Sequence, residues 1–103
     1  MTKYHSRKTE VDGIMFDSLK EASRYKELKM MQESGLISDL ELQKRFEILP
    51  KSMGNRAVFY VADFVYTQGG QTIVEDCKGF KTDVYKLKKK MFEYRYQTKI
   101  LES

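Results

Sequence analysis

Two apolar segments, residues 58–66 and 71–78, flank a pair of adjacent glycines in the middle of the chain. β-Branched and aromatic residues on either side of a two-residue glycine turn predict a β-hairpin. Each predicted strand also carries charge, since Asp63 interrupts the first strand and Asp76 and Lys78 lie two residues apart in the second. A buried charge is costly unless it is paired or binds a metal. This hairpin therefore constrains the fold more than any other segment.

Strand parity sorts the charged residues of the second strand between the two faces of the sheet. Side chains two residues apart point the same way, so Asp76 and Lys78 share a face with Val74. Glu75 and Cys77 point to the other face. We therefore expect Glu75 to stay outside any site that Asp76 forms, and the Cys77 thiol to be a packing group.

Asp63, predicted to share its face with Val61 and Val65, approaches Asp76 if the hairpin registers across the glycine turn. Two adjacent carboxylates repel unless a cation lies between them or one is protonated. Oxygen ligands favour a hard cation such as Mg²⁺ or Mn²⁺, and a nearby lysine can position a water molecule. This combination is typical of metal-assisted phosphodiester hydrolysis. The alternative is an exposed Asp76–Lys78 pair with Asp63 at a strand edge.

The chain of 103 residues predicts a single domain, residues 1–103, whose first helix spans residues 18–34. Ser18 followed three residues later by Glu21 is a capping-box pattern at the helix start. Gly35 is expected to end the helix in the left-handed conformation. The apolar stripe predicted for this helix consists of Leu19, Ala22, Tyr25, Leu28 and Met31.

The other elements complete a mixed architecture. Period-two alternation predicts a strand over residues 40–48, which Pro50 ends. A second helix is expected over residues 83–96, and residues 98–101 can add a short strand. The order helix, three strands, helix and one optional strand predicts an α/β or α+β sandwich. The apolar face predicted for the second helix consists of Val84, Leu87, Met91 and Tyr94.

Charge is concentrated at the C-terminal end. From residue 78 onward there are eight basic residues and three acidic ones, within a chain of formal net charge +4. Such a segment suits a polyanion, although a solvated lysine face gives the same pattern. Residues 1–11 form a basic arm that either frays or contacts phosphates. The candidate DNA-contacting residues are Lys3, Arg7, Lys8, Lys81, Lys86, Lys89 and Lys90.

The sequence favours a reducing compartment. The single cysteine cannot form an internal disulfide, and the start of the chain lacks the apolar core of a signal peptide. No segment approaches membrane-spanning length, so we expect no membrane partner and a cytoplasmic location.

Asp63 and the run Asp76-Cys77-Lys78, with Glu21 on a preceding helix, resemble the PD-(D/E)XK nuclease superfamily. More narrowly, nearly the whole chain is similar to small phage-borne proteins of that superfamily that are related to Holliday junction resolvases. The matching segments include residues 10–18, 39–43, 60–66, 74–82 and 85–90. Two residues depart from the motif, because Ala62 replaces its proline and its middle acid is aspartate.

The resemblance implies a restriction-endonuclease-like core, in which helices flank a central mixed sheet. It implies that Lys78 contacts the attacking water and that Gln43 lies beside the site. It also implies a site for Mg²⁺ or Mn²⁺ whose ligands are Asp63, Asp76, the Cys77 backbone carbonyl and Glu21. The capping role of Glu21 is the alternative for that residue.

The function expected from this resemblance is metal-dependent, structure-selective DNA cleavage of the Holliday junction resolvase type. Symmetric cleavage of a four-way junction requires two sites, so a homodimer is expected, in the host cytoplasm if the protein is phage-encoded. The alternatives are a nicking or restriction-like endonuclease on duplex DNA and a non-catalytic DNA-binding recombination accessory. The remaining alternative is a basic structural domain whose acids are salt-bridged.

Overall fold

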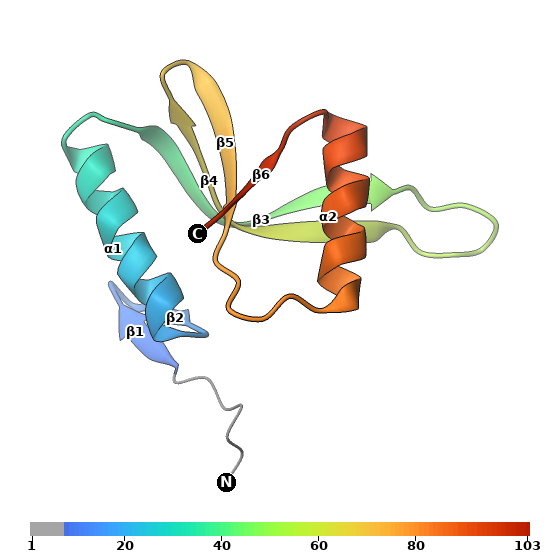
Figure 1. The fold of residues 1–103 in the computed structure, drawn as a ribbon, viewed down its shortest axis with the longest axis horizontal. Helices are drawn as coiled ribbons and strands as arrows, with labels where there is room; N and C mark the ends of the chain where they lie inside the picture. The colour runs from blue at the N-terminus through green and yellow to red at the C-terminus, as the bar shows by residue number, and fades with distance from the viewer. Residues whose placement is uncertain (1–7) are drawn as a thin grey trace, which may run out of the picture.

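The computed structural model describes residues 8–103, which form two helices and two sheets (Figure 1). The main sheet has the strand order β3-β4-β5-β6 and is mixed, because β5 and β6 are parallel while the other pairs are antiparallel. This confirms the expected mixed α/β architecture. The elements in chain order are β1 (Thr9–Val11), β2 (Ile14–Phe16), α1 (Leu19–Glu33), β3 (Ser38–Leu49), β4 (Val58–Gln68), β5 (Gln71–Asp76), α2 (Asp83–Tyr96) and β6 (Ile100–Glu102).

The end of the predicted arm is structured. Residues 9–11 form strand β1, which pairs antiparallel with β2 through a turn at Asp12 and Gly13. The expectation of an irregular arm over residues 1–11 is therefore wrong for its last three residues. Lys3 and Arg7 lie outside the described residues, and Lys8 is exposed.

The central hairpin has the predicted turn. Gly69 and Gly70 have φ angles of +58° and +77°, the two left-handed positions of a type I′ connection. This turn sets a register in which Phe64 pairs with Glu75. Strand β5 ends at Asp76, two residues before the predicted end, so Lys78 lies in the connection that follows.

Helix α1 has the predicted caps. The Ser18 hydroxyl accepts a hydrogen bond from the Glu21 amide, and at the other end the Leu36 amide donates to the Met31 carbonyl across Gly35. The latter bond is part of a Schellman motif, which Gly35 permits with its φ of +87°. The expected apolar stripe is buried in Ala22, Tyr25 and Leu28, whereas Leu19 is exposed.

One hydrophobic cluster, the α1-side cluster, lies between α1 and the part of the sheet near the β4–β5 turn. Leu40 and Leu42 of β3 pack against it. Its buried members are Phe16, Ala22, Tyr25, Leu28, Ile37, Phe64 and Tyr66.

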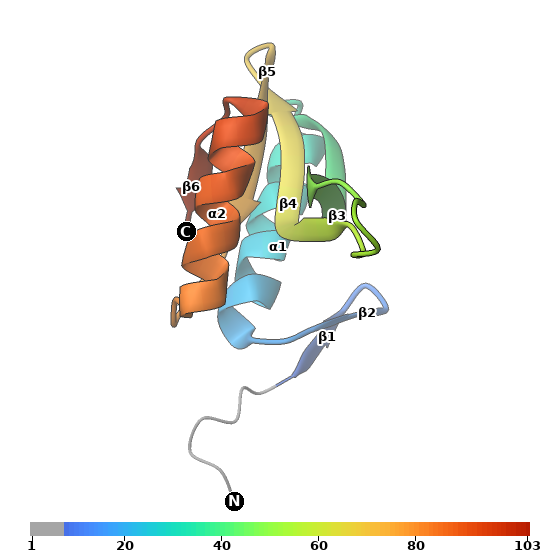
Figure 2. The same ribbon diagram turned by 90° about the vertical axis from the view of Figure 1, so that its right-hand side faces the viewer.

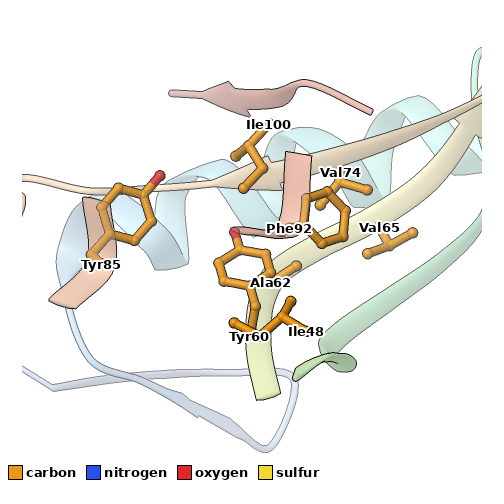
Figure 3. Packing of buried hydrophobic residues seen from close by; sticks show 8 residues of the cluster. All are labelled: Ile48, Tyr60, Ala62, Val65, Val74, Tyr85, Phe92 and Ile100. Atoms are coloured by element: carbon orange, nitrogen blue, oxygen red, sulfur yellow. The ribbon is translucent and has the colours of Figure 1, made fainter. Parts of the chain in front are cut away.

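A second cluster, the α2-side cluster, lies between α2 and the sheet (Figure 3). Phe92 is its centre, with ring centroids 5.0 Å from Phe46 and 5.2 Å from Tyr60. Its buried members are Ile48, Tyr60, Ala62, Val65, Val74, Tyr85, Phe92 and Ile100.

Strands β3 and β4 change direction near their middle (Figures 1 and 2). On β4, Tyr60 and Ala62 pack in the α2-side cluster, whereas Phe64 and Tyr66 pack in the α1-side cluster. Strand alternation places these four residues on one continuous face. That face therefore turns from one helix toward the other between Ala62 and Phe64.

The bend coincides with the pair Gln43 and Asp63, which lie opposite each other in the β3–β4 ladder. Gln43 has a φ of +54°, a left-handed conformation that costs a non-glycine residue about 1 kcal/mol. Strand alternation places Asp63 on the other face with Val61 and Val65. The bend divides the surroundings of that face as well, because Val61 is exposed and Val65 is buried in the α2-side cluster.

Helix α2 has the predicted bounds but presents a different face to the sheet. Tyr85 and Phe92 are its buried residues, whereas three of the four residues predicted to form its apolar face, Val84, Leu87 and Tyr94, are exposed. The prediction failed because two apolar stripes run along this helix, and periodicity alone does not choose between them.

Glu75 is buried completely and neutralised within the fold. The Arg24 guanidinium donates to both of its oxygens, at 2.6 and 3.0 Å, and the hydroxyls of Tyr66 and Ser103 also donate to it. Burial by itself raises the pKa of Glu75, but these hydrogen bonds lower it below its usual value. Glu75 is thus an ionised structural group that ties α1 to the sheet.

We predict that Arg24→Ala destabilises the protein by about 3–5 kcal/mol, because it leaves the Glu75 carboxylate buried and uncompensated. Adding Glu75→Gln to Arg24→Ala should restore part of the loss. Urea denaturation measures both effects, and Lys26→Ala on the exposed face of α1 is the matched control. A loss below about 0.5 kcal/mol for Arg24→Ala would contradict the structural role of this pair.

Candidate active site

Three buried acids and one lysine meet where the sheet bends. Glu21 comes from the first turn of α1, Asp63 from the bend in β4, and Asp76 from the end of β5. All three are buried, and Asp76 has 0% exposure. Lys78 follows β5 and completes the group. The hairpin turn and the N-cap of α1 therefore bring together residues that are far apart in the sequence.

Gln43 connects two of the acids. Its side-chain amide donates to Glu21 Oε2 at 3.2 Å and to Asp63 Oδ1 at 3.3 Å. The left-handed backbone at Gln43 interrupts the alternation of β3 at this point. The two hydrogen bonds offset the conformational cost by about 1 kcal/mol each. The Glu21 carboxylate thus takes part in the site, while its backbone amide serves the helix cap.

Asp63 and Asp76 are held by different partners. Asp63 Oδ2 accepts a hydrogen bond of 2.9 Å from the Cys77 amide. Asp76 Oδ2 accepts one from the Tyr60 hydroxyl inside the α2-side cluster. Asp76 Oδ1 lies 3.2 Å from Lys78 Nζ, yet within residues 8–103 no group forms a hydrogen bond to this buried oxygen. One oxygen of Asp76 is therefore fixed, and the other has only an ion-pair contact.

Lys78 is held between an acid and an aromatic ring. Its ammonium lies 5.2 Å from the centroid of the Tyr85 ring, in addition to its contact with Asp76. Burial lowers the pKa of Lys78, but the charges of Asp76 and Asp63 outweigh this effect and raise it above its usual value. Lys78 is therefore a hydrogen-bond donor at neutral pH, suited to orient a water molecule or to stabilise negative charge.

The acids repel one another and are hard to ionise together. Burial, followed by the charges of Asp63 and Asp17, raises the pKa of Glu21 to about 7. Burial and the adjacent Asp63 also raise the pKa of Asp76, although the Tyr60 hydrogen bond and Lys78 act in the opposite direction. Raised carboxyl pKa values of this kind, caused by burial together with a like charge, are common in functional sites.

The residues at this site fit a metal ion only in part. Across residues 8–103, no three or more histidine, cysteine, aspartate or glutamate side chains are grouped so that they could hold a metal. The Gln43 amide separates Glu21 from Asp63, and the Lys78 ammonium lies beside Asp76. The donor chemistry does suit a hard cation, because Asp63 and Asp76 supply oxygens that repel each other. Asp76 Oδ1 is the buried oxygen that lacks a hydrogen bond.

The residues predicted to be catalytic or to bind a metal lie at this site. Asp63, Asp76, Lys78, Glu21 and Gln43 are brought together through the contacts described above. The Cys77 amide contacts Asp63, which places the Cys77 backbone at the site.

Strand alternation correctly predicted that the side chains of Glu75 and Cys77 point away from the site. Glu75 pairs with Arg24 on the opposite face, and Cys77 packs against the α1-side cluster with Sγ 3.0 Å from Ser103 Oγ. Burial raises the pKa of the Cys77 thiol, which suits a packing role. Sequence reasoning missed Tyr60, since an aromatic residue in an apolar strand gives no sign that its hydroxyl reaches an acid 16 positions later.

Four of the candidate DNA-contacting residues lie on α2 or just before it, namely Lys81, Lys86, Lys89 and Lys90. Lys81 and Lys89 both approach Glu102, at 3.1 and 3.9 Å. Lys86 and Lys90 are exposed, and no ion pair found within residues 8–103 involves them. These four lysines, with Tyr85, line an open hollow of about 380 Å³. Tyr85 links this basic hollow to the site, because it lines the hollow and Lys78 lies over its ring.

The fold and the site define a mixed α/β protein with a buried carboxylate–lysine cluster at a bend in its sheet. The chain belongs to the family described as "Protein of unknown function (DUF1064)", whose model matches residues 1–102. Comparisons with curated proteins and with solved structures gave no match. Neither helix in residues 8–103 has the length and apolarity needed to cross a bilayer. The family description gives no activity, so a function must be argued from the site.

The raised pKa of Glu21 predicts that the metal-free protein loses stability as the pH rises. Glu21 releases its proton near pH 4.5 in the unfolded chain and near pH 7 in the folded one. Between these values the folded state binds more protons, so the free energy of unfolding falls with rising pH and then levels off above 7. The raised pKa of Asp76 acts in the same direction.

Glu21→Gln should therefore raise the melting temperature at pH 8 by about 4–8 °C, which corresponds to about 1 kcal/mol. At pH 4.5 it should change little, because Glu21 is then protonated in the folded state. The glutamine keeps an acceptor for the Gln43 amide. Thermal melts at both pH values in EDTA measure the effect, with the exposed Glu33→Gln as control. An equal shift at the two pH values would contradict the assignment.

Proposed function

We propose that this protein is a metal-dependent endodeoxyribonuclease that hydrolyses phosphodiester bonds in branched DNA, in the manner of a Holliday junction resolvase. The observation that carries the proposal is the meeting of Asp63, Asp76 and Lys78 at one buried site, with Glu21 and Gln43 beside them. These are the residues at which the sequence resembles the PD-(D/E)XK nucleases. Burial and neighbouring charge raise the carboxyl pKa values of Glu21 and Asp76, and a bound cation would relieve this repulsion.

The cofactor in this proposal is Mg²⁺ or Mn²⁺, held by Asp63, Asp76 and the Cys77 carbonyl, with Glu21 completing the site. When bound, the metal supplies Lewis-acid activation of the phosphate and lowers the pKa of water. Metal binding requires the Gln43 amide to move away from its position between Glu21 and Asp63. A raised pKa also means that metal affinity increases with pH, because the ligands bind the cation only when ionised.

The residues of the chain have separate tasks in the hydrolysis. Lys78 orients the attacking water and stabilises the negative charge that develops on the phosphate oxygens. Tyr60 holds Asp76 Oδ2, so that Asp76 Oδ1 faces Lys78. Gln43 keeps Glu21 and Asp63 near each other until the cation takes its place. Tyr60 and Gln43 are thus positioning residues.

The proposed substrate contact runs from the acids over Tyr85 to the lysines of α2. Lys86 and Lys90 are free to contact phosphates, whereas Lys81 and Lys89 must first leave Glu102. Contacts to the backbone without base readout suit recognition of DNA shape. Since two symmetric cuts resolve a four-way junction, the proposal includes a homodimer with two such sites.

Cleavage assays test the enzyme. With Mg²⁺, the wild type should cleave labelled four-way junctions, and Asp76→Asn and Lys78→Ala should each lose at least about 100-fold in rate. The exposed acid variant Glu41→Gln is the control and should cleave normally. Mg²⁺ should also raise the melting temperature of the wild type at pH 8 but not that of Asp76→Asn.

The substrate panel separates the proposal from its alternatives. Equal cleavage of linear duplex and junction would favour a nicking or restriction-like endonuclease. Junction binding with no cleavage in either Mg²⁺ or Mn²⁺ would favour a non-catalytic recombination accessory. If no divalent metal changes the melting temperature or permits cleavage, the nuclease proposal is wrong.

Salt dependence tests the lysine contacts. Lys86→Ala combined with Lys90→Ala should weaken DNA binding and lower the slope of log affinity against log salt by about 2, since each phosphate contact contributes about 0.9. Fluorescence anisotropy on duplex DNA between low and moderate salt measures the slope. Lys26→Ala on α1 is the control. An unchanged slope in the double variant would mean that DNA contacts a surface other than the one formed by Lys86 and Lys90.

A further inference from the structure

Helix α2 carries an apolar stripe that the fold leaves uncovered. Val84, Leu87 and Tyr94 are 64%, 57% and 81% exposed, and Met91 of the same stripe is half-buried. The spacing of these four residues is three, four and three, the a and d pattern of a coiled-coil helix. Tyr85 and Phe92 occupy a different side of the helix and already pack against the sheet. We call the stripe formed by Val84, Leu87, Met91 and Tyr94 the α2 seam.

A hollow next to the seam extends its apolar surface. It has a volume of about 620 Å³ and lies between the end of β3 and the C-terminal half of α2. Leu49 and Pro50 line one side, and the seam residues Met91 and Tyr94 line the other. A side chain of a partner could enter it beside the seam, as an anchor residue does in helix-in-groove recognition.

Basic residues border the seam on both sides. In the heptad that places Val84 and Met91 at a, positions e are Lys88 and Arg95 and position g between them is Lys90. Arg95 is partly neutralised by Glu47 at 3.5 Å, and Asp83 is the one acid at an equivalent flanking position. The border therefore carries net positive charge, which is concentrated at Lys88 and Lys90 in the middle of the stripe.

We propose that the α2 seam docks an acidic amphipathic helix of a protein partner, with apolar residues at a and d and Asp or Glu at e and g. The charges favour this occupant over a second copy of the chain. In an antiparallel α2–α2 pair, Lys88 and Lys90 would lie opposite basic residues of the other copy, and in a parallel pair Lys90 would lie opposite Arg95. These like-charge contacts are unfavourable, and only the parallel pair offsets them, through Asp83 opposite Lys88. The homodimer proposed above then uses another surface.

Duplex DNA is a second polyanion whose charge suits the basic border of the seam. It fits the seam less well, because Val84, Leu87 and Met91 offer no hydrogen bond to a base edge or a phosphate. The lysines proposed for DNA, Lys86 and Lys90, lie toward the Glu102 side of the helix. An acidic helix on the seam would leave Lys86 accessible. This docking inference does not depend on nuclease activity.

Direct binding of a designed peptide tests the proposal. The probe is a labelled helical peptide of about 21 residues with Leu at a and d and Glu at e and g; its acidic flanks keep it from pairing with itself. We expect a dissociation constant in the micromolar range by fluorescence anisotropy. A matched peptide with Lys at e and g should bind at least about 10-fold more weakly.

Two variants locate the binding surface. Leu87→Ser combined with Tyr94→Ser should weaken binding of the acidic peptide at least about 10-fold. Met30→Ser combined with Leu36→Ser removes equally exposed apolar residues from α1 and its end, and should bind normally. Lys88→Glu combined with Lys90→Glu should reverse the preference between the acidic and basic peptides. Because the seam variants replace exposed side chains, a normal melting temperature checks that they fold.

Several outcomes would overturn the inference. Equal binding of the two peptides, or no binding of the acidic one below about 1 mM, excludes an acidic helix as the occupant. A dimer in sedimentation velocity that becomes a monomer in Leu87→Ser/Tyr94→Ser identifies a second copy instead. A loss of DNA affinity in the same variant, with no change in peptide binding, assigns the seam to nucleic acid.

Discussion

The structure depends on burying carboxylates at the point where the sheet bends between its two hydrophobic clusters. Asp63 lies at that bend and Asp76 beside it, and both acids are buried there. Gln43 adopts a left-handed backbone there and donates to Glu21 and Asp63. The site is consequently part of the architecture, since the same residues shape the sheet and hold the acids.

Neighbouring acids on β5 show how the surroundings assign their roles. Glu75 is neutralised by Arg24 and two hydroxyls, so its pKa falls and it serves the fold. For Asp76, on the other face, burial and the adjacent Asp63 outweigh the opposing effects of Tyr60 and Lys78, so its pKa rises. Both residues are completely buried. Neutralisation therefore distinguishes the structural acid from the one that we propose to bind a metal.

Three sides of helix α2 have different surroundings. Tyr85 and Phe92 pack in the α2-side cluster, the lysines near Glu102 border the basic hollow, and the α2 seam faces outward. A helix of 14 residues with two apolar stripes can pack through either. Periodicity predicted that the helix exists and where it begins and ends. It selected the wrong apolar stripe as the buried one, because the shape of the sheet beneath the helix determines which stripe packs.

The sequence by itself determined the hairpin, the caps of α1, the bounds of both helices and the opposite directions of Glu75 and Asp76. These follow from local rules: glycine conformations, capping side chains and the two-residue period of a strand. The tertiary structure alone decided that Gln43 joins Glu21 to Asp63, that Tyr60 reaches Asp76, and which side of α2 is buried. These contacts join residues distant in the chain across a bend, and no local pattern encodes the direction in which a strand bends.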